Sequence, residues 1–213
     1  MPVSRPPAPL EAFEQLLAGN RRFASGRPVH GQGLGPERRA ELLTGQLPFA
    51  AVLACADSRT GPEHVFDAGL GELYVCRSAG ALLDELLLGS LEYGVLHCGC
   101  PLVCVLGHSG CGACGAGVAA IRDPLRSESA GLDEVVRRVL PAVLGTWRTG
   151  RDEREWVDAA SRANVELVCR QLLGRSRGLA ARHREGNLEV VGMWYDLATG
   201  LVELVVPIVE VER

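Results

Sequence analysis

The chain has 213 residues, of which 47% are hydrophobic, 23% charged and 5% aromatic, with a formal net charge of −4 at pH 7. This composition is typical of a globular protein, and the weakly acidic balance indicates neither a nucleic-acid partner nor binding to an anionic membrane. Because no stretch reaches the roughly 18 apolar residues of a membrane span and the proline-rich start lacks an apolar secretory signal, we expect a cytoplasmic protein.

The first part of the chain reads as a helical arm. Hydrophobic periodicity predicts a helix over residues 10–23, a linker rich in Gly and Pro over 26–35, and a short helix over 36–43. We expect residues 1–45 to form an N-terminal helical arm that packs on a partner subunit, ahead of one α/β domain over residues 46–213.

The remainder alternates between strands and helices. Strands are expected over residues 49–54, 73–76, 102–106, 188–195 and 201–209, and helices over 63–67, 84–97, 112–122, 128–150, 155–173 and 176–184. Such alternation predicts an α/β fold with a mostly parallel β-sheet flanked by helices. The last two strands are joined by a short turn, which indicates an antiparallel edge strand.

Two segments with reactive side chains follow strands of the expected sheet, where α/β proteins place their sites. The first contains Cys55, Asp57 and Arg59 at alternate positions, which share one side if the chain stays extended. The second contains His108 and Cys111 at the start of a helix, where a thiol ionises more easily. Two thiolates and one imidazole favour zinc, and three protein ligands leave the fourth position open, as in catalytic sites.

The alternative interpretation of Cys55, His108 and Cys111 is that they only pack in the core. The polar, glycine-rich residues that follow both strands argue against it. Most of the eight cysteines are expected to have no functional role, and Cys104 and Cys169 should be core residues. Cys114 forms a Cys-x-x-Cys pair with Cys111, so a redox partner or a substitute ligand stands beside packing as an interpretation.

The sequence resembles the β-class carbonic anhydrases. Their metal motifs, C-x-D-x-R and H-x-x-C, stand here at residues 55–59 and 108–111, and the similarity extends over roughly residues 10–209. The chain departs from the family pattern at Ala81, where Asn is common, and at Thr60 and Gly61, where an apolar pair is usual. Val52 replaces a Trp that some members associate with an inhibitory bicarbonate site, so we expect no such regulation.

The resemblance implies a homodimer or a higher homo-oligomer with the active site at the subunit interface. It implies one Zn²⁺ per subunit, held by Cys55, His108 and Cys111, with Asp57 and Arg59 as a catalytic dyad. The substrate pocket for carbon dioxide and bicarbonate would be lined, in part from the partner subunit, by Gln46, Tyr74, Ala79 and Tyr93.

The expected reaction is the reversible hydration of carbon dioxide to bicarbonate and a proton by zinc-bound hydroxide. Asp57 paired with Arg59 would orient the nucleophile, whereas Asp57 released from Arg59 could block the metal. Two alternatives keep the metal site: a hydrolase of carbon disulfide or carbonyl sulfide with the same fold, and a zinc-binding regulator without turnover. His64 and His97 are weaker candidates for carrying protons to solvent.

Overall fold

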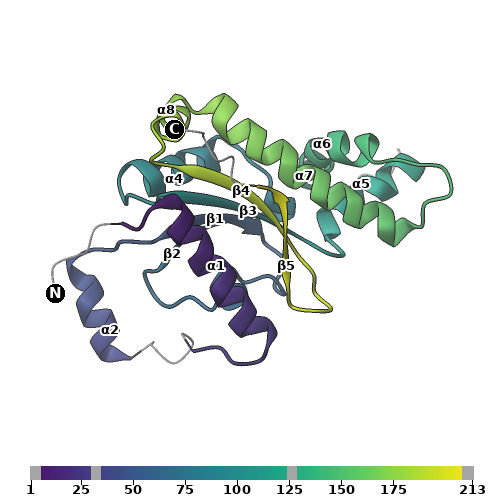
Figure 1. Cartoon of the computed structure of the whole chain (residues 1–213). Coiled ribbons are helices and arrows are strands. Elements are labelled where there is room, and N and C mark those ends of the chain that lie inside the picture. The colour runs from purple at the N-terminus through teal and green to yellow at the C-terminus, as the bar shows by residue number, and fades with distance from the viewer. Residues whose placement is uncertain (1–5, 30–34, 124–128, 208–213) are drawn as a thin grey trace.

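A computed structural model describes residues 6–29, 35–123 and 129–207. Its centre is one five-stranded sheet with the strand order β2-β1-β3-β4-β5 (Figure 1). The strands are β1 (Ala50–Cys55), β2 (Leu73–Ser78), β3 (Leu102–His108), β4 (Glu189–Tyr195) and β5 (Val202–Val206). β1 to β4 pair in parallel and β5 pairs antiparallel with β4. The predicted mostly parallel sheet with an antiparallel edge strand is therefore confirmed.

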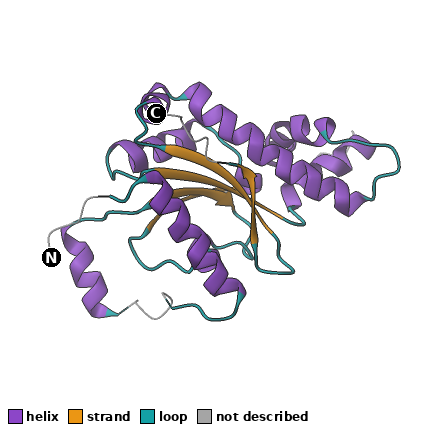
Figure 2. Cartoon of the chain, in the orientation of Figure 1, coloured by secondary structure: helices purple, strands orange, loops and turns teal. Residues whose placement is uncertain are grey.

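Helices cover both faces of this sheet (Figure 2). They are α1 (Pro9–Ala24), α2 (Pro36–Glu41), α3 (Pro62–Val65), α4 (Glu85–Leu96), α5 (Gly112–Arg122), α6 (Ala130–Gly145), α7 (Glu153–Arg175) and α8 (Arg177–Arg184), with short 3-10 turns at Leu42–Thr44 and Ala79–Ala81. Every residue of β1, β3 and β4 is buried, which explains their continuous apolar character. Among the described residues, no helix combines the length and hydropathy needed to cross a bilayer.

Three apolar clusters hold these layers together. One cluster lies between one face of the sheet and the helices α1 and α3. A second cluster lies between the opposite face and the helices α4, α7 and α8. The third joins α5, α6 and the first half of α7 into a helical lobe beyond the carboxyl end of the sheet (Figure 1). The edge of the sheet where β1 and β3 end therefore faces this lobe.

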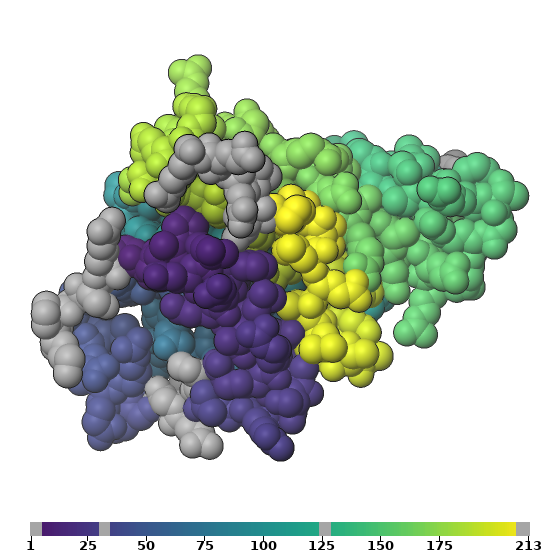
Figure 3. Space-filling view, in the orientation of Figure 1, coloured from purple at the N-terminus to yellow at the C-terminus, as the bar shows by residue number. Residues whose placement is uncertain are grey.

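The first helix of the predicted arm packs on its own chain. Ala12 and Leu16 of α1 are fully buried in the cluster on the sheet face. Asn20, which is 2% exposed, donates a hydrogen bond to the Gly200 carbonyl at 2.9 Å and accepts one from the Val202 N–H at 3.0 Å. The space-filling view shows α1 against this C-terminal segment (Figure 3). Packing of residues 1–45 on a partner subunit stays a prediction.

Element boundaries differ from the expected ones where backbone pairing extends a strand. β3 continues to His108 because its register with β4 pairs His108 with Tyr195. β1 likewise includes Cys55, which pairs with Ser78 of β2. The helix expected over 128–150 begins at Ala130 and ends at Gly145. Residue 128 and the last two residues of the strand expected over 201–209 lie outside the described residues.

Candidate metal centre

Three potential ligands meet at the carboxyl edge of the sheet. Cys55 is the last residue of β1, His108 is the last residue of β3, and Cys111 is the N-cap of α5. Their ligand atoms all lie within 4.8 Å of one another, and this is the one such group found among the described residues. All three side chains are buried, with at most 5% exposed. The meeting follows from topology, because β1 and β3 are parallel neighbours whose carboxyl ends coincide.

The orientation of His108 fits a metal ligand. Its Nδ1 lies 2.9 Å from the carbonyl oxygen of Ser109, so this nitrogen carries the proton and donates a hydrogen bond. The other nitrogen, Nε2, is buried and has no hydrogen-bond partner. Unpaired buried polar atoms are rare, and a free imidazole lone pair beside two thiols is the usual arrangement of a metal-binding histidine.

The two thiols are arranged for a cation. The neighbouring Cys111 thiol and burial raise the pKa of Cys55 to about 12. The neighbouring Cys114 thiol, more than any other group, raises the pKa of Cys111 to about 12, so the easier ionisation expected at a helix start is wrong for the protein without metal. A bound cation would reverse this, because metal binding drives thiols to thiolates. The N–H of Gly80 already points at Cys55 Sγ, at 3.3 Å. Two sulfur donors and one nitrogen donor suit zinc.

A carboxylate–guanidinium pair lies beside the ligands. Arg59 donates from Nε to Asp57 Oδ1 at 2.9 Å and from NH2 to Asp57 Oδ2 at 2.6 Å. This bidentate contact holds the pKa of the Asp57 carboxyl far below its usual range. The condition under which alternate residues of 55–59 would share one side, an extended chain, is not met, because the chain turns at 58–59 and the Thr60 N–H donates to the Asp57 carbonyl at 3.1 Å. The turn still brings Asp57 and Arg59 together.

Arg77 was not predicted as a site residue, yet it fixes the backbone of the first ligand segment. Its Nε donates to the Cys55 carbonyl at 2.9 Å and its NH2 donates to the Asp57 carbonyl at 2.6 Å. The signal that could have found it is its place near the end of β2, where the register pairs it with Ala54. Only the strand order, which the sequence does not state, makes these segments neighbours.

Helix α7 supports the other ligand segments through side chains that the sequence analysis did not single out as site residues. Ser161 Oγ donates to the His108 carbonyl at 2.9 Å. Asn164 Nδ2 donates at 2.8 Å to the carbonyl of Gly80, the residue whose N–H meets Cys55. Both side chains belong to residues less than 5% exposed. Buried polar residues three apart on one helix are the signal that could have indicated this role.

Among the four predicted pocket residues, Ala79 lies beside the ligands. It begins the Ala79–Ala81 turn, which carries the N–H that meets Cys55. Ala81 in this turn has φ of 53°, in the left-handed region that favours Gly or Asn. The departure from the family pattern at this position thus places an alanine in a backbone conformation that an asparagine tolerates better.

The other three predicted pocket residues lie toward the opposite end of the sheet. Gln46 is exposed in the connection that precedes β1. Tyr74 pairs with Ala51, four residues before Cys55 along β1, which corresponds to about 13 Å. The ring of Tyr93, a 52% exposed residue, lies 6.3 Å from that of Tyr74. Within one chain these side chains do not join the ligand set.

The remaining cysteines behave largely as expected. Cys104 and Cys169 are 0% and 4% exposed and belong to apolar clusters, which confirms them as core residues. Cys114 is 1% exposed and packs in the cluster of the helical lobe, within hydrogen-bonding reach of Cys111. Packing accounts for the burial of Cys114. Because Cys114 lies near Cys111, a redox pair with Cys111 and a role as a substitute ligand are tested below.

The fold and the donor set define an α/β protein with a candidate metal site at the carboxyl edge of its sheet. Residues 50–202, more than half of the chain, match the family model described as carbonic anhydrase. The chain belongs to the β-carbonic anhydrase family, a family of carbonate dehydratases. The resemblance found in the motifs is therefore confirmed.

Relatives and solved structures agree. The chain is 40% identical over 192 residues to carbonic anhydrase 2 of Mycobacterium tuberculosis, covering 90% of each chain. It is 40% identical over 204 residues to a carbonic anhydrase of Mycolicibacterium smegmatis, covering 96% of this chain and 95% of that one. The Coccomyxa β-carbonic anhydrase in complex with acetazolamide is similar with a TM-score of 0.72 and 25% identity, covering 92% of this chain and 87% of that one. A tetrameric β-carbonic anhydrase of Sordaria macrospora has a TM-score of 0.69 at 22% identity, covering 91% and 96%.

Proposed function

We propose that this protein is a zinc-dependent carbonic anhydrase that catalyses the reversible hydration of carbon dioxide to bicarbonate and a proton. One zinc ion per subunit would be held by Cys55, His108 and Cys111. The observation that carries this proposal is the buried, unpartnered Nε2 of His108 beside two buried thiols. The relatives named carbonic anhydrase at 40% identity support the substrate.

A zinc ion bound there would supply a Lewis acid that lowers the pKa of a water molecule in its open position. The residues around it would orient this water and keep the position open. Asp57, which Arg59 holds ionised, would accept a hydrogen bond from the water. Arg59 would also keep the Asp57 carboxylate from turning onto the metal, since both carboxylate oxygens are engaged by the guanidinium.

The pocket would be completed by a second copy of the chain. Ala79 lies beside the ligands, whereas Gln46, Tyr74 and Tyr93 lie toward the other end of the sheet and would come from the partner subunit. We therefore propose a homodimer or a higher homo-oligomer; the similar Sordaria macrospora protein is described as tetrameric. A cytoplasmic location is proposed on the sequence argument alone, with the cysteines reduced as metal ligands require.

The test is stopped-flow hydration of carbon dioxide at pH 7 and pH 8.5, on protein whose zinc content has been measured. Turnover should rise with pH, because two thiolates cancel the charge of the metal and make its water harder to ionise. The same protein should lose activity after chelation and regain it with added zinc. Absence of turnover from fully loaded protein at both pH values would overturn the proposal, and assays with carbon disulfide and carbonyl sulfide would then decide between another substrate and a protein without turnover.

A further inference from the structure

One contact at the metal centre involves a residue that the proposed reaction does not use. Asp158 of α7 accepts a hydrogen bond through Oδ1 from the backbone N–H of Gly110 at 2.7 Å. Gly110 lies between the two ligands His108 and Cys111, with φ of +61°, and nothing lies within 4 Å of the place where its side chain would start. No side chain packs against this position, and the hydrogen bond to Asp158 holds the Gly110 N–H in place.

The carbonyl of the same glycine faces the catalytic dyad. It lies 3.5 Å from Arg59 NH2, and among the described residues it is the one acceptor that the Arg59 guanidinium meets apart from Asp57. The Arg59 side chain is 56% exposed, and an exposed ion pair is weak on its own because solvent competes for both partners. The Gly110 carbonyl, at the long limit of a hydrogen bond, is a second contact that restricts where the guanidinium lies beside Asp57.

We propose that Asp158 is a positioning residue for the Asp57–Arg59 pair, acting through the backbone of Gly110. This inference rests on the proposed function of the dyad. Asp158 is the first of three polar residues spaced three apart on α7, followed by Ser161 and Asn164. Each one hydrogen-bonds to a backbone segment of the metal centre, so one rigid helix sets the relative positions of these segments.

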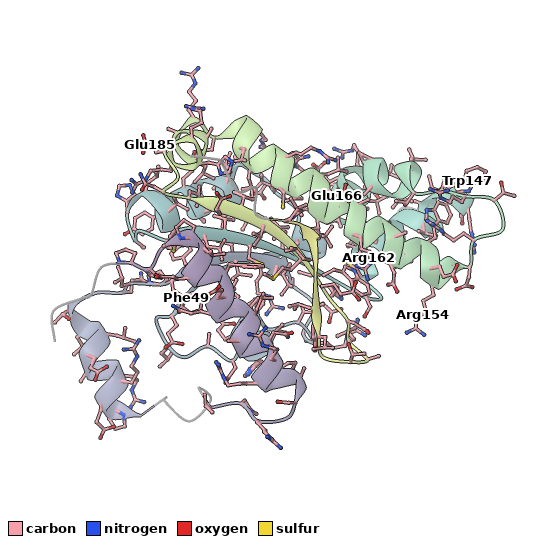
Figure 4. The ribbon with its side chains drawn as sticks, viewed as in Figure 1. Phe49, Trp147, Arg154, Arg162, Glu166 and Glu185 are labelled. Atoms are coloured by element: carbon pink, nitrogen blue, oxygen red, sulfur yellow. The ribbon has the colours of Figure 1, made fainter. Side chains whose placement is uncertain are left out.

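Asp158 can be changed without removing the support of the helix itself. It is half-buried, whereas the neighbouring Val157 and Ala160 are buried in the apolar cluster of the lobe. Asp158→Ala removes the acceptor for the Gly110 N–H, and Asp158→Asn keeps an oxygen at that place. Glu166→Ala is the matched control: Glu166 lies two turns further along α7 (Figure 4), its side chain is 47% exposed, and among the described residues its ion-pair partner is Arg170 of the same helix.

The three variants are measured for zinc content, for kcat and KM of carbon dioxide hydration, and for the absorption spectrum of the cobalt(II)-substituted protein. Asp158→Ala should keep one metal per chain and lower kcat about tenfold with little change in KM. Its cobalt spectrum should differ from wild type, because the freed Asp57 carboxylate reaches the metal, and adding Asp57→Ala should remove that difference. Asp158→Asn and Glu166→Ala should stay within about twofold of wild type.

Equal kcat and equal cobalt spectra for Asp158→Ala and wild type would overturn the inference. So would an Asp158→Asn variant as impaired as Asp158→Ala, because the hydrogen bond would then not be the cause. If wild-type protein fails to hydrate carbon dioxide, the proposed function fails, and the cobalt spectra of the same variants still decide whether Asp158 controls the access of Asp57 to the metal.

Discussion

The two ends of the β-sheet differ in how completely one chain builds them. At the carboxyl end, Cys55, His108 and Cys111 are buried, and the backbone that carries them is held by side chains from β2 and α7. Toward the amino end, Gln46 and Tyr93 are exposed. A single chain therefore assembles the proposed metal centre by itself and leaves the proposed pocket open.

The physical demands on the two ends explain this difference. Zinc ligands must lie about 2.0 to 2.3 Å from the ion, which requires donors held rigidly by buried hydrogen bonds. Carbon dioxide is small and uncharged, so its pocket needs little more than walls of suitable shape and a few polar groups. Walls of this kind can be supplied across a subunit interface, where the exposed aromatic side chains at the amino end would become buried.

The largest expected effect comes from removing an imidazole at the carboxyl end. His108→Ala should lose the metal and lower activity at least about a thousandfold, because two thiolates alone do not complete the site. His97→Ala is the matched control: this imidazole stacks on Tyr93 with ring centroids 5.0 Å apart, on the side of the pocket residues. It should keep one zinc per chain, and equal zinc contents in the two variants would contradict the assignment of His108 as a ligand.

The next largest effect distinguishes the role of the Asp57–Arg59 pair in turnover from the role of the three ligands in metal binding. Arg59→Ala should retain zinc but lower kcat about a hundredfold or more, since Asp57 loses the partner that engages both of its oxygens. Zinc content and stopped-flow hydration measure the two quantities on the same sample. Arg154→Ala, an exposed arginine at the start of α7 (Figure 4), serves as the control. An Arg59→Ala variant with wild-type activity would remove the dyad from the mechanism.

Metal binding should depend steeply on pH. The pKa values of Cys55 and Cys111 are each raised to about 12 in the absence of metal, so both thiols carry protons between pH 7 and pH 9. Zinc binds thiolates, so binding releases these protons and the apparent affinity rises with pH, by up to about a hundredfold per pH unit for two protons. Chelator competition at pH 7 and pH 8 measures this change. An affinity independent of pH would mean that the thiolates exist before the metal arrives.

A mixing experiment tests whether the two ends meet across a subunit interface. His108→Ala lacks a ligand, and the double variant Gln46→Ala, Tyr93→Ala lacks pocket residues, so each alone should be nearly inactive. Co-expressed in equal amounts, they should recover about a quarter of wild-type activity, because half of the dimers are mixed and each mixed dimer has one intact site. A mixture that stays inactive would place the pocket within a single chain.

The meeting of Cys55, His108 and Cys111 could be predicted from the sequence, because the first two end parallel strands and the third follows three residues after His108. The apolar runs before Cys55 and His108 indicate buried parallel strands, and parallel neighbours end at the same edge. The conformation of residues 55–59 does not follow from the sequence, because side chains alternate only where the chain is extended. Here the chain turns at residues 58–59, and a hydrogen bond from the Thr60 N–H to the Asp57 carbonyl closes that turn.

The supporting contacts could not be predicted, because they depend on how distant elements cross. Ser161 is 53 residues from His108, and Asn164 is 84 residues from Gly80. No local pattern states that α7 passes beside both segments. The sequence does contain the polar spacing Asp158, Ser161 and Asn164, but an exposed polar stripe on a helix has the same spacing, and only burial distinguishes the two.

The smallest expected effect concerns the cysteine beside the ligands. Cys114 is 1% exposed in the cluster of the helical lobe, so Cys114→Ala should lower the free energy of unfolding by about 1 kcal/mol through lost packing. Zinc content and kcat should stay within about twofold of wild type, because three ligands remain. Loss of zinc would instead identify Cys114 as a ligand. Inactivation by hydrogen peroxide should proceed at the same rate in both proteins if packing is its role, whereas a slower loss of activity in the variant would show that Cys114 forms a disulfide with Cys111.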